Sequence, residues 1–281
     1  MIVVEQKEEL FSQIGQWKQQ GLKTALVPTM GFFHEGHLSL MREALHHADK
    51  TVVSIFVNPR QFGPNEDLEK YPRNLARDTS LANQENVDIL FLPSTKIMYP
   101  NGYQTTVSVP ELSHMLCGQS RPCHFDGVAT VVAKLFNLVR PDIAVFGSKD
   151  YQQLALIRRM VLDLNFNINI VGHPIVRESN GLAMSSRNKY LEGQEREDAL
   201  CLYQGLQYGI KRIKETGTID ATLLKSEIKD ILNCVKSCKI DYVQIVDPIS
   251  LVEKEQVQSG DVLALAAYFN NKVRLIDNTI L

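Results

Sequence analysis

The sequence predicts an α/β protein in which a doubly wound parallel sheet precedes a smaller C-terminal α+β domain. Over the first part of the chain, strand-like and helix-like segments alternate, and the strand-like segments are apolar without a break. Unbroken apolar strands are typical of a parallel sheet that helices cover on both faces. After Arg187 the order changes, because two helices then come before three strands. We therefore expect one domain over residues 1–175 and a second over residues 176–281.

The expected elements of the first domain each have a local signal. The first helix is expected to carry Leu10, Phe11, Ile14 and Trp17 on one face. Pro28 should end the second strand, because it has no amide hydrogen for a sheet ladder. The strands are expected at residues 2–4, 24–27, 51–57, 87–92, 104–109, 143–147 and 168–171. The helices are expected at residues 7–20, 36–47, 74–84, 127–139 and 151–164, with a polar loop at residues 58–71.

The second domain has a different order of elements. The sequence Asn270-Asn271 between its last two strands is typical of a tight hairpin turn. The helices are expected at residues 194–215 and 220–236, and the strands at residues 240–246, 262–268 and 273–281.

The composition narrows the function classes. The chain has 281 residues, of which 44% are hydrophobic and 22% charged, with a net charge of −2. This balance gives no electrostatic basis for binding nucleic acid or an anionic membrane. The N-terminus lacks the features of a signal peptide, and no apolar run approaches membrane-spanning length. The five scattered cysteines indicate reduced thiols, so we expect a cytoplasmic protein.

The stretch after the second strand is the strongest local signal. A strand, a short turn and a helix leave the first helical N–H groups unpaired, and the positive end of the helix dipole at the turn suits a phosphate. Gly31 and Gly36 let the backbone approach a bulky anion closely. His34 and His37 lie one helical turn apart and can donate to phosphate oxygens.

Other interpretations of this stretch remain open. The histidines are three apart rather than four, so the zinc pattern His-Glu-x-x-His is not met. Two surface histidines at a loop explain the stretch by itself equally well. The decision therefore depends on the rest of the chain.

Three further polar clusters follow expected strands or join the domains. The amides after the third strand, in 58–62, suit a carboxylate or hydroxyl without adding charge. In 147–153, Lys149 can neutralise a phosphate, whereas Asp150 can bind Mg²⁺, bind a ribose hydroxyl or simply cap a helix. The segment 184–188 is either a phosphate clamp or a linker. Together the clusters indicate a nucleotide and a small polar acid, and the Gly-x-Gly-x-x-Gly sequence typical of hydride-transfer enzymes is absent.

Motifs in order from Val27 to Leu191 extend this picture. As a set they resemble the pantothenate synthetase (pantoate–β-alanine ligase) family, and the His-x-Gly-His element alone resembles the wider superfamily of nucleotidylyltransferases. Phe32-Phe33 departs from the smaller pair usual in the family. The matching motifs are Pro28-Thr-Met-Gly31, His34-x-Gly-His37-Leu-Ser-Leu, Phe56-Val-Asn-Pro-x-Gln-Phe62, Tyr71-Pro-Arg73, Leu116-Cys-Gly118, Arg121-Pro-x-His-Phe125, Phe146-Gly-x-Lys-Asp-x-Gln-Gln153 and Gly181-Leu-Ala-Met-Ser-Ser-Arg-Asn188.

The resemblance implies a reaction in two steps. ATP and (R)-pantoate give pantoyl adenylate and pyrophosphate, and β-alanine then attacks the adenylate to give pantothenate and AMP. It also implies a Rossmann-like sheet, Mg²⁺ and a homodimer. The protein's work would be positioning and charge stabilisation, with water excluded from the intermediate.

The resemblance assigns the site residues by motif. Gln61 would bind both pantoate and β-alanine, and Arg121 and His124 would lie near the pantoate pocket or the subunit contact. The catalytic residues are His37, the proton donor, with His34, Lys149, Ser185 and Arg187. The residues of the ATP site are Met30, Gly31, Phe32, Phe33, His34, Glu35, Gly36, His37, Gly147, Ser148, Lys149, Asp150, Val176, Met184, Ser185, Ser186 and Arg187. The pantoate site consists of Gln61, Gln153 and Asn58, and no metal ligand is assigned.

Two alternatives belong to other classes. Another nucleotidylyltransferase with the His-x-Gly-His element would act on a phosphorylated substrate, which calls for cations where Asn58 and Gln61 lie. A nucleotide-binding module without catalysis would not need His37 or Lys149.

Overall fold

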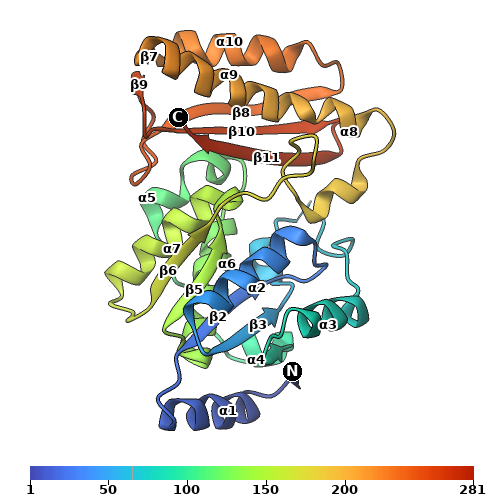
Figure 1. Cartoon of the computed structure of the whole chain (residues 1–281), viewed down its shortest axis with the longest axis vertical. Coiled ribbons are helices and arrows are strands. Elements are labelled where there is room, and N and C mark those ends of the chain that lie inside the picture. The colour runs from blue at the N-terminus through green and yellow to red at the C-terminus, as the bar shows by residue number, and fades with distance from the viewer. Residues whose placement is uncertain (65) are drawn as a thin grey trace. The chain divides into compact units, whose positions relative to one another are not determined.

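The computed structural model describes residues 1–64 and 66–281, so Asn65 in the expected polar loop lies outside the described residues. The chain divides into two compact units (Figure 1). Unit 1 comprises residues 1–148 and 156–174, and unit 2 comprises residues 149–155 and 175–281. The division into two folding domains at residue 175 stays a prediction, because compactness does not establish independent folding. Among the described residues, no helix is both long and apolar enough to span a membrane.

Unit 1 contains a six-stranded sheet in which every neighbouring pair is parallel, as predicted. The strand order reverses between β2 and β5, and ligands bind at such a switch point, beyond the carboxyl ends of the strands. Across the sheet the strands are β1 (Ile2–Val4), β4 (Ile89–Phe91), β3 (Lys50–Ile55), β2 (Thr24–Thr29), β5 (Ile143–Gly147) and β6 (Asn169–His173).

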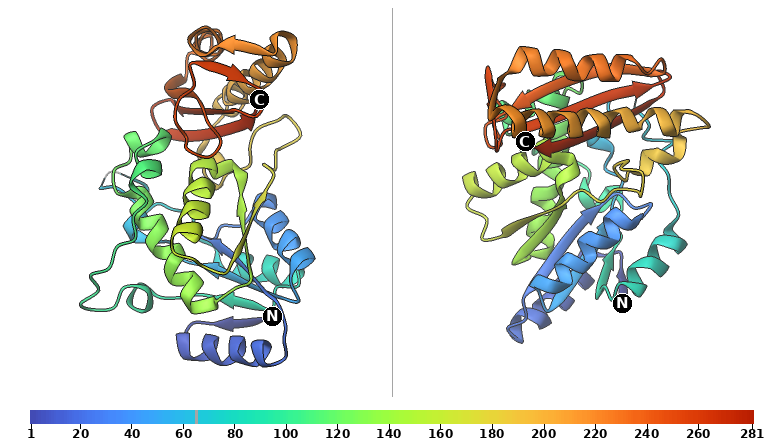
Figure 2. Two further views of the ribbon diagram at one scale, coloured as in Figure 1. Left: turned by 90° about the vertical axis from the view of Figure 1, so that its left-hand side faces the viewer. Right: turned by 45° about the horizontal axis from the view of Figure 1, so that its top comes forward.

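Helices cover both faces of this sheet (Figure 2). On one face, Val27 and Val145 pack in one buried cluster with Met41 of α2. On the other face, the ring of Phe146 meets Phe136 of α6 with 6.4 Å between ring centroids. The helices are α1 (Lys7–Gln19), α2 (Glu35–His47), α3 (Leu75–Gln84), α4 (Thr95–Met98), α5 (Pro110–Ser113), α6 (His124–Val139) and α7 (Tyr151–Asp163).

Pro28 does not end its strand, so that prediction is wrong. Strand β2 continues through it to Thr29. In a parallel strand the backbone groups of successive residues face the two neighbouring strands alternately, so residues four apart face the same neighbour. Thr24 lies four residues before Pro28, and its carbonyl oxygen accepts from Asp142 N on the β5 side at 2.8 Å. Pairing with β5 stops at Leu26. The missing amide hydrogen of Pro28 therefore faces a side where the ladder has already ended.

The strand expected at residues 104–109 is also absent from the described structure, where this segment is irregular. Its backbone bonds to side chains instead of to a neighbouring strand. Val107 N donates to Thr130 Oγ1 of α6 at 2.9 Å, and Thr105 O accepts from Arg60 at 3.2 Å. These side-chain partners take the place of a sheet ladder.

Unit 2 contains the two predicted long helices and the three predicted long strands, together with two short strands that were not predicted, one of them between the helices. Leu206 of α9 and Ile228 of α10 pack with Leu265 over one face of the antiparallel sheet β11-β10-β8. Asn270 and Asn271 have φ of 49° and 56°, which confirms the predicted hairpin turn. The elements are α8 (Glu195–Asp198), α9 (Leu200–Thr216), β7 (Thr218–Asp220), α10 (Ala221–Asn233), β8 (Cys238–Val246), β9 (Gln256–Gln258), β10 (Val262–Phe269) and β11 (Val273–Ile280).

The close approach of α6 to the turn after β3 gives a test of the packing. A Cβ on Gly127 would lie 2.3 Å from the carbonyl oxygen of Arg60, which is backbone and cannot move aside alone. We expect Gly127→Ala to lower the free energy of unfolding by about 1–3 kcal/mol. A Cβ on Gly15 in α1 meets nothing within 4 Å. Gly15→Ala should therefore raise stability by about 0.5–1 kcal/mol in the same urea titrations, and a Gly127→Ala curve matching wild type would contradict the packing.

Candidate active site

The turn between β2 and α2 is held by a tight backbone conformation. Gly31 has φ of +83°, and a Cβ there would lie 2.9 Å from Ile55 Cγ2. Gly31 N donates to Thr29 Oγ1 at 3.1 Å, and the Thr29 hydroxyl donates to Ser54 O at 2.7 Å. The ends of β2 and β3 therefore fix where the turn begins, and only glycine fits at position 31.

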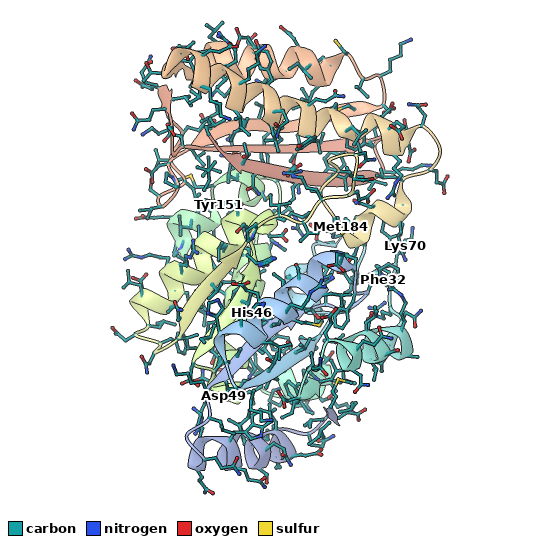
Figure 3. All side chains as sticks on the ribbon, in the orientation of Figure 1. Phe32, His46, Asp49, Lys70, Tyr151 and Met184 are labelled. Carbon is teal, nitrogen blue, oxygen red and sulfur yellow. The ribbon has the colours of Figure 1, made fainter. Side chains whose placement is uncertain are left out.

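Helix α3 clamps the same turn from the other side. Asp78 is 2% exposed, and its two carboxylate oxygens accept from Phe32 N at 2.7 Å and Phe33 N at 2.8 Å. Arg77 donates to Phe33 O at 2.8 Å, and its guanidinium lies 5.8 Å from the centroid of the Phe32 ring, which Figure 3 labels. Phe32 has φ of 54°, a left-handed conformation that costs energy outside glycine. The Asp78 bonds hold this conformation in place.

His34 and His37 form a reciprocal cap at the start of α2. His34 Nδ1 accepts from Gly36 N at 3.1 Å, and His37 Nδ1 accepts from His34 N at 3.3 Å. The ring centroids are 4.2 Å apart. A ring nitrogen that accepts a hydrogen bond carries no proton, so each neutral ring has its proton on Nε2. Both imidazoles are thus fixed as Nε2–H donors.

This cap corrects one expectation about the turn. Unpaired backbone N–H groups were expected to bind the anion, but the amides of five residues in this turn donate to side chains: Gly31, Phe32, Phe33, His34 and Gly36. The fixed imidazoles therefore become the donors that this turn offers to an anion.

Asn58 and Gln61 form a buried amide pair beyond β3. The Nδ2 of Asn58 donates to Gln61 Oε1 at 3.1 Å and to Gly127 O at 3.0 Å, and its Oδ1 accepts from Arg60 N and Tyr99 OH. Both donors and the acceptor of Asn58 are thus engaged. Asn58 is suited to positioning Gln61, whose Nε2 donates to Met30 Sδ at 3.0 Å.

Tyr99 lies behind this amide pair. Its hydroxyl donates to Asn58 at 2.8 Å, and burial raises the pKa of Tyr99 to about 12. The hydroxyl therefore stays protonated at neutral pH and keeps its place as a donor.

A second network holds the backbone of Gln61. Arg121 binds Glu66 through two hydrogen bonds of 2.7 Å and contacts His124 Nε2 at 3.0 Å. His124 Nδ1 donates to Gln61 O at 2.6 Å. Burial raises the pKa of Glu66, but the hydrogen bonds and charge of Arg121 outweigh it and hold that pKa below its ordinary value. Arg121 and His124 were expected near the pantoate pocket or the subunit contact. In the structure both contact the main-chain oxygen of Gln61, a residue predicted to bind pantoate.

In unit 2, Lys149 and Asp150 begin the segment that leads into α7. The ammonium of Lys149 lies 3.8 Å from Asp150 Oδ1, and the side chain of Asp150 is 51% exposed. Lys149 O accepts from Asn278 Nδ2 at 2.8 Å. Gln153 lies half-buried in the first turn of α7, whereas Gln152 beside it is buried.

Val176 and Met184 are the two ends of a short hairpin in unit 2. Met184 N donates to Val176 O at 3.0 Å; Figure 3 labels Met184. Ser185 then caps the 3₁₀ helix η4 (Ser186–Tyr190), since its hydroxyl accepts from Arg187 N at 3.2 Å. The backbone bond brings Val176 and Met184 together, and the Ser185 cap fixes the start of the helix that contains Ser186 and Arg187.

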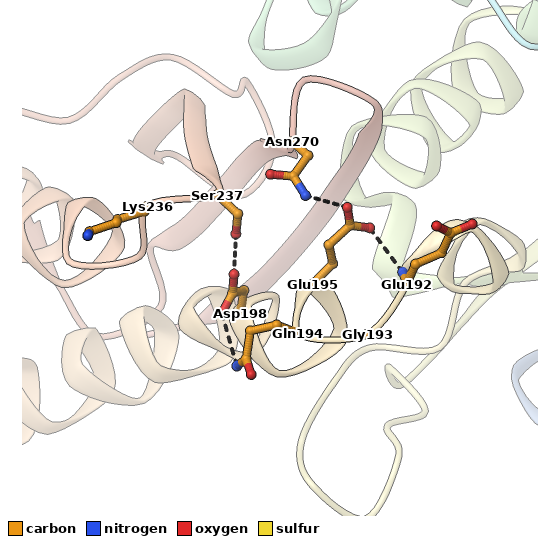
Figure 4. Close-up of a pocket in the computed structure, with 8 residues that line it drawn as sticks. All are labelled: Glu192, Gly193, Gln194, Glu195, Asp198, Lys236, Ser237 and Asn270. Carbon is orange, nitrogen blue, oxygen red and sulfur yellow. Dashed lines mark hydrogen bonds between the residues drawn. The ribbon is translucent and has the colours of Figure 1, made fainter.

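An open pocket in unit 2 contains none of the predicted site residues (Figure 4). Two of its carboxylates have partners: Asn270 donates to Glu195, and Ser237 donates to Asp198. The backbone bond from Glu192 and the amide of Asn270 hold the pKa of Glu195 below its ordinary value. The pocket is lined by Glu192, Gly193, Gln194, Glu195, Asp198, Lys236, Ser237 and Asn270.

With this geometry established, comparison with known proteins identifies the family. A sequence model of the family described as pantoate-beta-alanine ligase matches residues 2–280. The chain belongs to this family. It is therefore an enzyme, a ligase that joins pantoate to β-alanine using ATP.

Individual relatives agree with the family match along the whole chain. The pantothenate synthetase of Sulfurihydrogenibium sp. (strain YO3AOP1) is 56% identical over 262 residues, covering 93% of each chain. The crystal structure of pantothenate synthetase from Thermus thermophilus has a TM-score of 0.94 and 42% identity, covering 100% of this chain and 99% of that one. That of pantoate-beta-alanine ligase from Francisella tularensis, complexed with beta-gamma ATP and beta-alanine, has a TM-score of 0.80 and 35% identity, covering 100% and 97%.

The structure adds supporting residues of the ligase that the sequence analysis did not single out. Asp78 fixes the histidine turn, Tyr99 supports Asn58, and Arg177 binds the hairpin that contains Gly181. Asp78 had a detectable signal, because it shares the apolar face of α3 with Ala82 at a spacing of four. Tyr99 and Arg177 act through partners 41 and 100 residues away, which no local pattern reveals.

The Glu66–Arg121 pair makes the ligase sensitive to acid. Because the folded-state pKa of Glu66 is lowered from its ordinary 4.5, the pair stabilises the protein above that pH, and the contribution is lost as the pH falls through the folded-state pKa. Glu66→Gln removes the titrating group, so its free energy of unfolding should decline less than that of wild type as the pH falls below about 4.5. Urea titrations across this range measure the slope.

Arg121→Met serves as the matched variant, because it removes the partner and keeps the carboxyl. Its acid slope should also be shallower than that of wild type. Parallel curves for all three proteins would show that the pair does not contribute to acid sensitivity.

Proposed function

We propose that this ligase works through a pantoyl adenylate. A carboxylate oxygen of pantoate attacks the α-phosphorus of ATP, and the bond to the bridging oxygen breaks to release pyrophosphate. The neutral amine of β-alanine then attacks the acyl carbon, loses a proton and displaces AMP, which leaves with the bonding electron pair. Activation is needed because a free carboxylate is a poor acyl donor.

One observation carries this proposal: the amide of Gln61 contacts the histidine turn. Gln61 Nε2 lies 3.0 Å from the sulfur of Met30, the residue before Gly31. An uncharged amide suited to an acid is thus adjacent to the start of the turn that leads to the two Nε2–H imidazoles suited to phosphate. This adjacency supports attack by the acid on the nucleotide.

We further propose roles for the residues that would bind ATP. His34 and His37 donate to phosphate oxygens, with His37 as the proton donor, and Lys149 and Arg187 supply positive charge. Ser185 and Ser186 donate through their hydroxyls. The Francisella relative forms a complex with beta-gamma ATP and beta-alanine, which supports an ATP site in this chain. The remaining proposed contacts are Met30, Gly31, Phe32, Phe33, Glu35, Gly36, Gly147, Ser148, Asp150, Val176 and Met184.

The proposed acid site rests on neutral amides. Gln61 and Gln153 bind pantoate, and Gln61 also orients the amine of β-alanine. Asn58 contributes by holding Gln61, since its own hydrogen-bonding groups are occupied. Neutral amides bind the carboxylate without withdrawing as much charge from it as a cation would, which keeps it nucleophilic.

We propose that Mg²⁺ accompanies ATP. Across residues 1–64 and 66–281, no group of three or more His, Cys, Asp or Glu residues could hold a metal ion. Mg²⁺ does not need such a group, because it is usually held by one or two carboxylates together with phosphate oxygens and water. Asp150 offers a half-exposed carboxylate beside Lys149. Bound Mg²⁺ would neutralise charge on the phosphates.

We also propose a cytoplasmic homodimer. All five cysteines are free thiols, which supports a reducing compartment. The edge strand β1 exposes Ile2 and Val3 at 43% each, and an apolar sheet edge of this kind suits a subunit contact.

The order of the reaction tests the adenylate. Pantoate alone should support exchange of labelled pyrophosphate into ATP, because the first step does not involve β-alanine. The measurement compares exchange with pantoate, with β-alanine and with both, using enzyme of known turnover. Exchange that requires β-alanine, or that never occurs with active enzyme, would exclude a free-standing adenylation step.

The charge of Gln61 tests the acid site. Gln61→Glu keeps the size of the side chain, but it removes the amide donors and adds a negative charge. Pantoate affinity should fall by about tenfold or more, as for loss of a charge-assisted hydrogen bond of about 1.5–3 kcal/mol, while ATP affinity stays nearly unchanged. Calorimetric titration of each ligand measures both.

Gln84→Glu, at the exposed end of α3, is the matched control and should bind both ligands as wild type does. Equal loss of ATP and pantoate in Gln61→Glu would indicate a folding defect. Unchanged pantoate binding would remove Gln61 from the acid site.

A further inference from the structure

The last strand of the chain contains two buried polar residues that the proposed mechanism does not use. Asp277 is 3% exposed and Asn278 is 6% exposed, within the sheet of unit 2. A buried carboxylate and amide are costly unless their hydrogen bonds are made. Their partners therefore show what the pair does.

Asn278 holds the backbone of Lys149. Its Nδ2 donates to Lys149 O at 2.8 Å, and its own amide N donates to Asp277 Oδ1 at 2.8 Å. The charge of Lys149 also acts on the Asp277 carboxylate. Strand β11 thus fixes the main chain of the residue proposed to bring a cation to the phosphates.

Asp277 holds the hairpin between Val176 and Met184, which is the second segment of unit 2 proposed to contact ATP. Its oxygens accept from Arg177 NH1 at 2.6 Å and from NH2 at 2.9 Å. The same NH1 donates to Gly181 O at 3.0 Å, and the guanidinium lies 4.8 Å from the centroid of the Tyr203 ring. Arg177 pairs with Ala183 across the hairpin that leads into Ser185, Ser186 and Arg187.

We infer that Asp277 and Asn278 are positioning residues for ATP, which join the Lys149 segment and the hairpin ending at Met184 through one rigid point in β11. Neither needs to touch the nucleotide. Adjacent residues on one strand fix both segments, so the cation of Lys149 and the residues after Met184 keep a constant separation. This inference rests on the proposed ATP site.

Stabilisation of the sheet alone would explain the same contacts, so the test needs a matched pair. Arg274 in β11 and Asp241 in β8 form such a pair, with N–O distances of 2.7 and 3.0 Å and side chains 16% and 17% exposed. It joins strands of the same sheet nearer the start of β11. Asp241→Asn therefore reports what loss of a comparable pair does to folding.

The experiment compares Asn278→Asp, Asp277→Asn and Asp241→Asn in the full-length ligase. Asn278→Asp keeps the shape but replaces the donor to Lys149 O with an acceptor. We expect both β11 variants to bind a non-hydrolysable ATP analogue more weakly and to have a KM for ATP raised by about tenfold, which is the effect of losing one good hydrogen bond. The KM for pantoate should change by less than about twofold in the same variants, because the hydrogen bonds described for both residues hold segments of the proposed ATP site. Asp241→Asn should lower Tm similarly and leave the KM for ATP unchanged.

Lys149→Ala separates this inference from the proposed site. If Lys149→Ala weakens binding of the analogue, Asn278→Asp should add little in that background, because the ammonium that Asn278 positions through the main chain is then absent. If both β11 variants bind ATP as wild type does while Lys149→Ala binds it more weakly, the inference is overturned and the proposed ATP site stands. Unchanged binding in Lys149→Ala overturns the ATP site and the inference with it. Equal loss of ATP binding in Asp241→Asn overturns the inference in favour of a folding effect.

Discussion

The backbone amides between β2 and α2 are the constraint on which this active site depends. Each buried N–H at a helix start needs an acceptor, and here Thr29, Asp78 and the two imidazoles supply them. A turn that binds phosphate through bare amides would need none of these partners. Because the amides are occupied, the imidazoles are fixed in one tautomer and rotamer, so the same hydrogen bonds that cap α2 also prepare two donors.

The proposed acid site depends on the same requirement at the end of β3. Asn58 is 1% exposed and satisfies all its groups on Gln61, Gly127, Arg60 and Tyr99. Gln61 is therefore held at its side chain by an amide and at its carbonyl by His124. A positioned but neutral amide binds a carboxylate without a counter-charge that would lower its nucleophilicity.

The sequence was sufficient for the fold class and for one turn of unit 2. Unbroken apolar strands predicted the parallel sheet, and the Asn270-Asn271 turn predicted the hairpin. Predictions from the sequence failed where contacts with residues distant in the sequence decide the local structure. Pro28 stays in its strand because the hydrogen-bond ladder to β5 has already ended, and in residues 104–109 the backbone bonds to Thr130 instead of to a neighbouring strand. Asp277 and Asn278 escaped notice for the same reason, since their partners lie at least 100 residues away.

The cations of the chain can be sorted by the carboxylates they meet. Arg121 and Arg177 each make two hydrogen bonds to a carboxylate with limited exposure, 25% for Glu66 and 3% for Asp277. Turning either guanidinium to a phosphate would leave that carboxylate unpaired, which costs several kcal/mol in buried pairs, about 3–5 kcal/mol. Both arginines are thereby committed to structure.

Lys149 differs from these arginines in its partner. Its ammonium lies 3.8 Å from Asp150, whose side chain is half exposed, and an ion pair with such a partner contributes little, about 0–1 kcal/mol. Its charge also acts on the buried Asp277 carboxylate, but that carboxylate already accepts two hydrogen bonds from Arg177. In a chain with a net charge of −2, a phosphate site must come from local placement of cations. In the proposed site, the arginines that bind buried carboxylates hold the structure, and Lys149, whose paired carboxylate is half exposed, is the cation proposed to meet the phosphates.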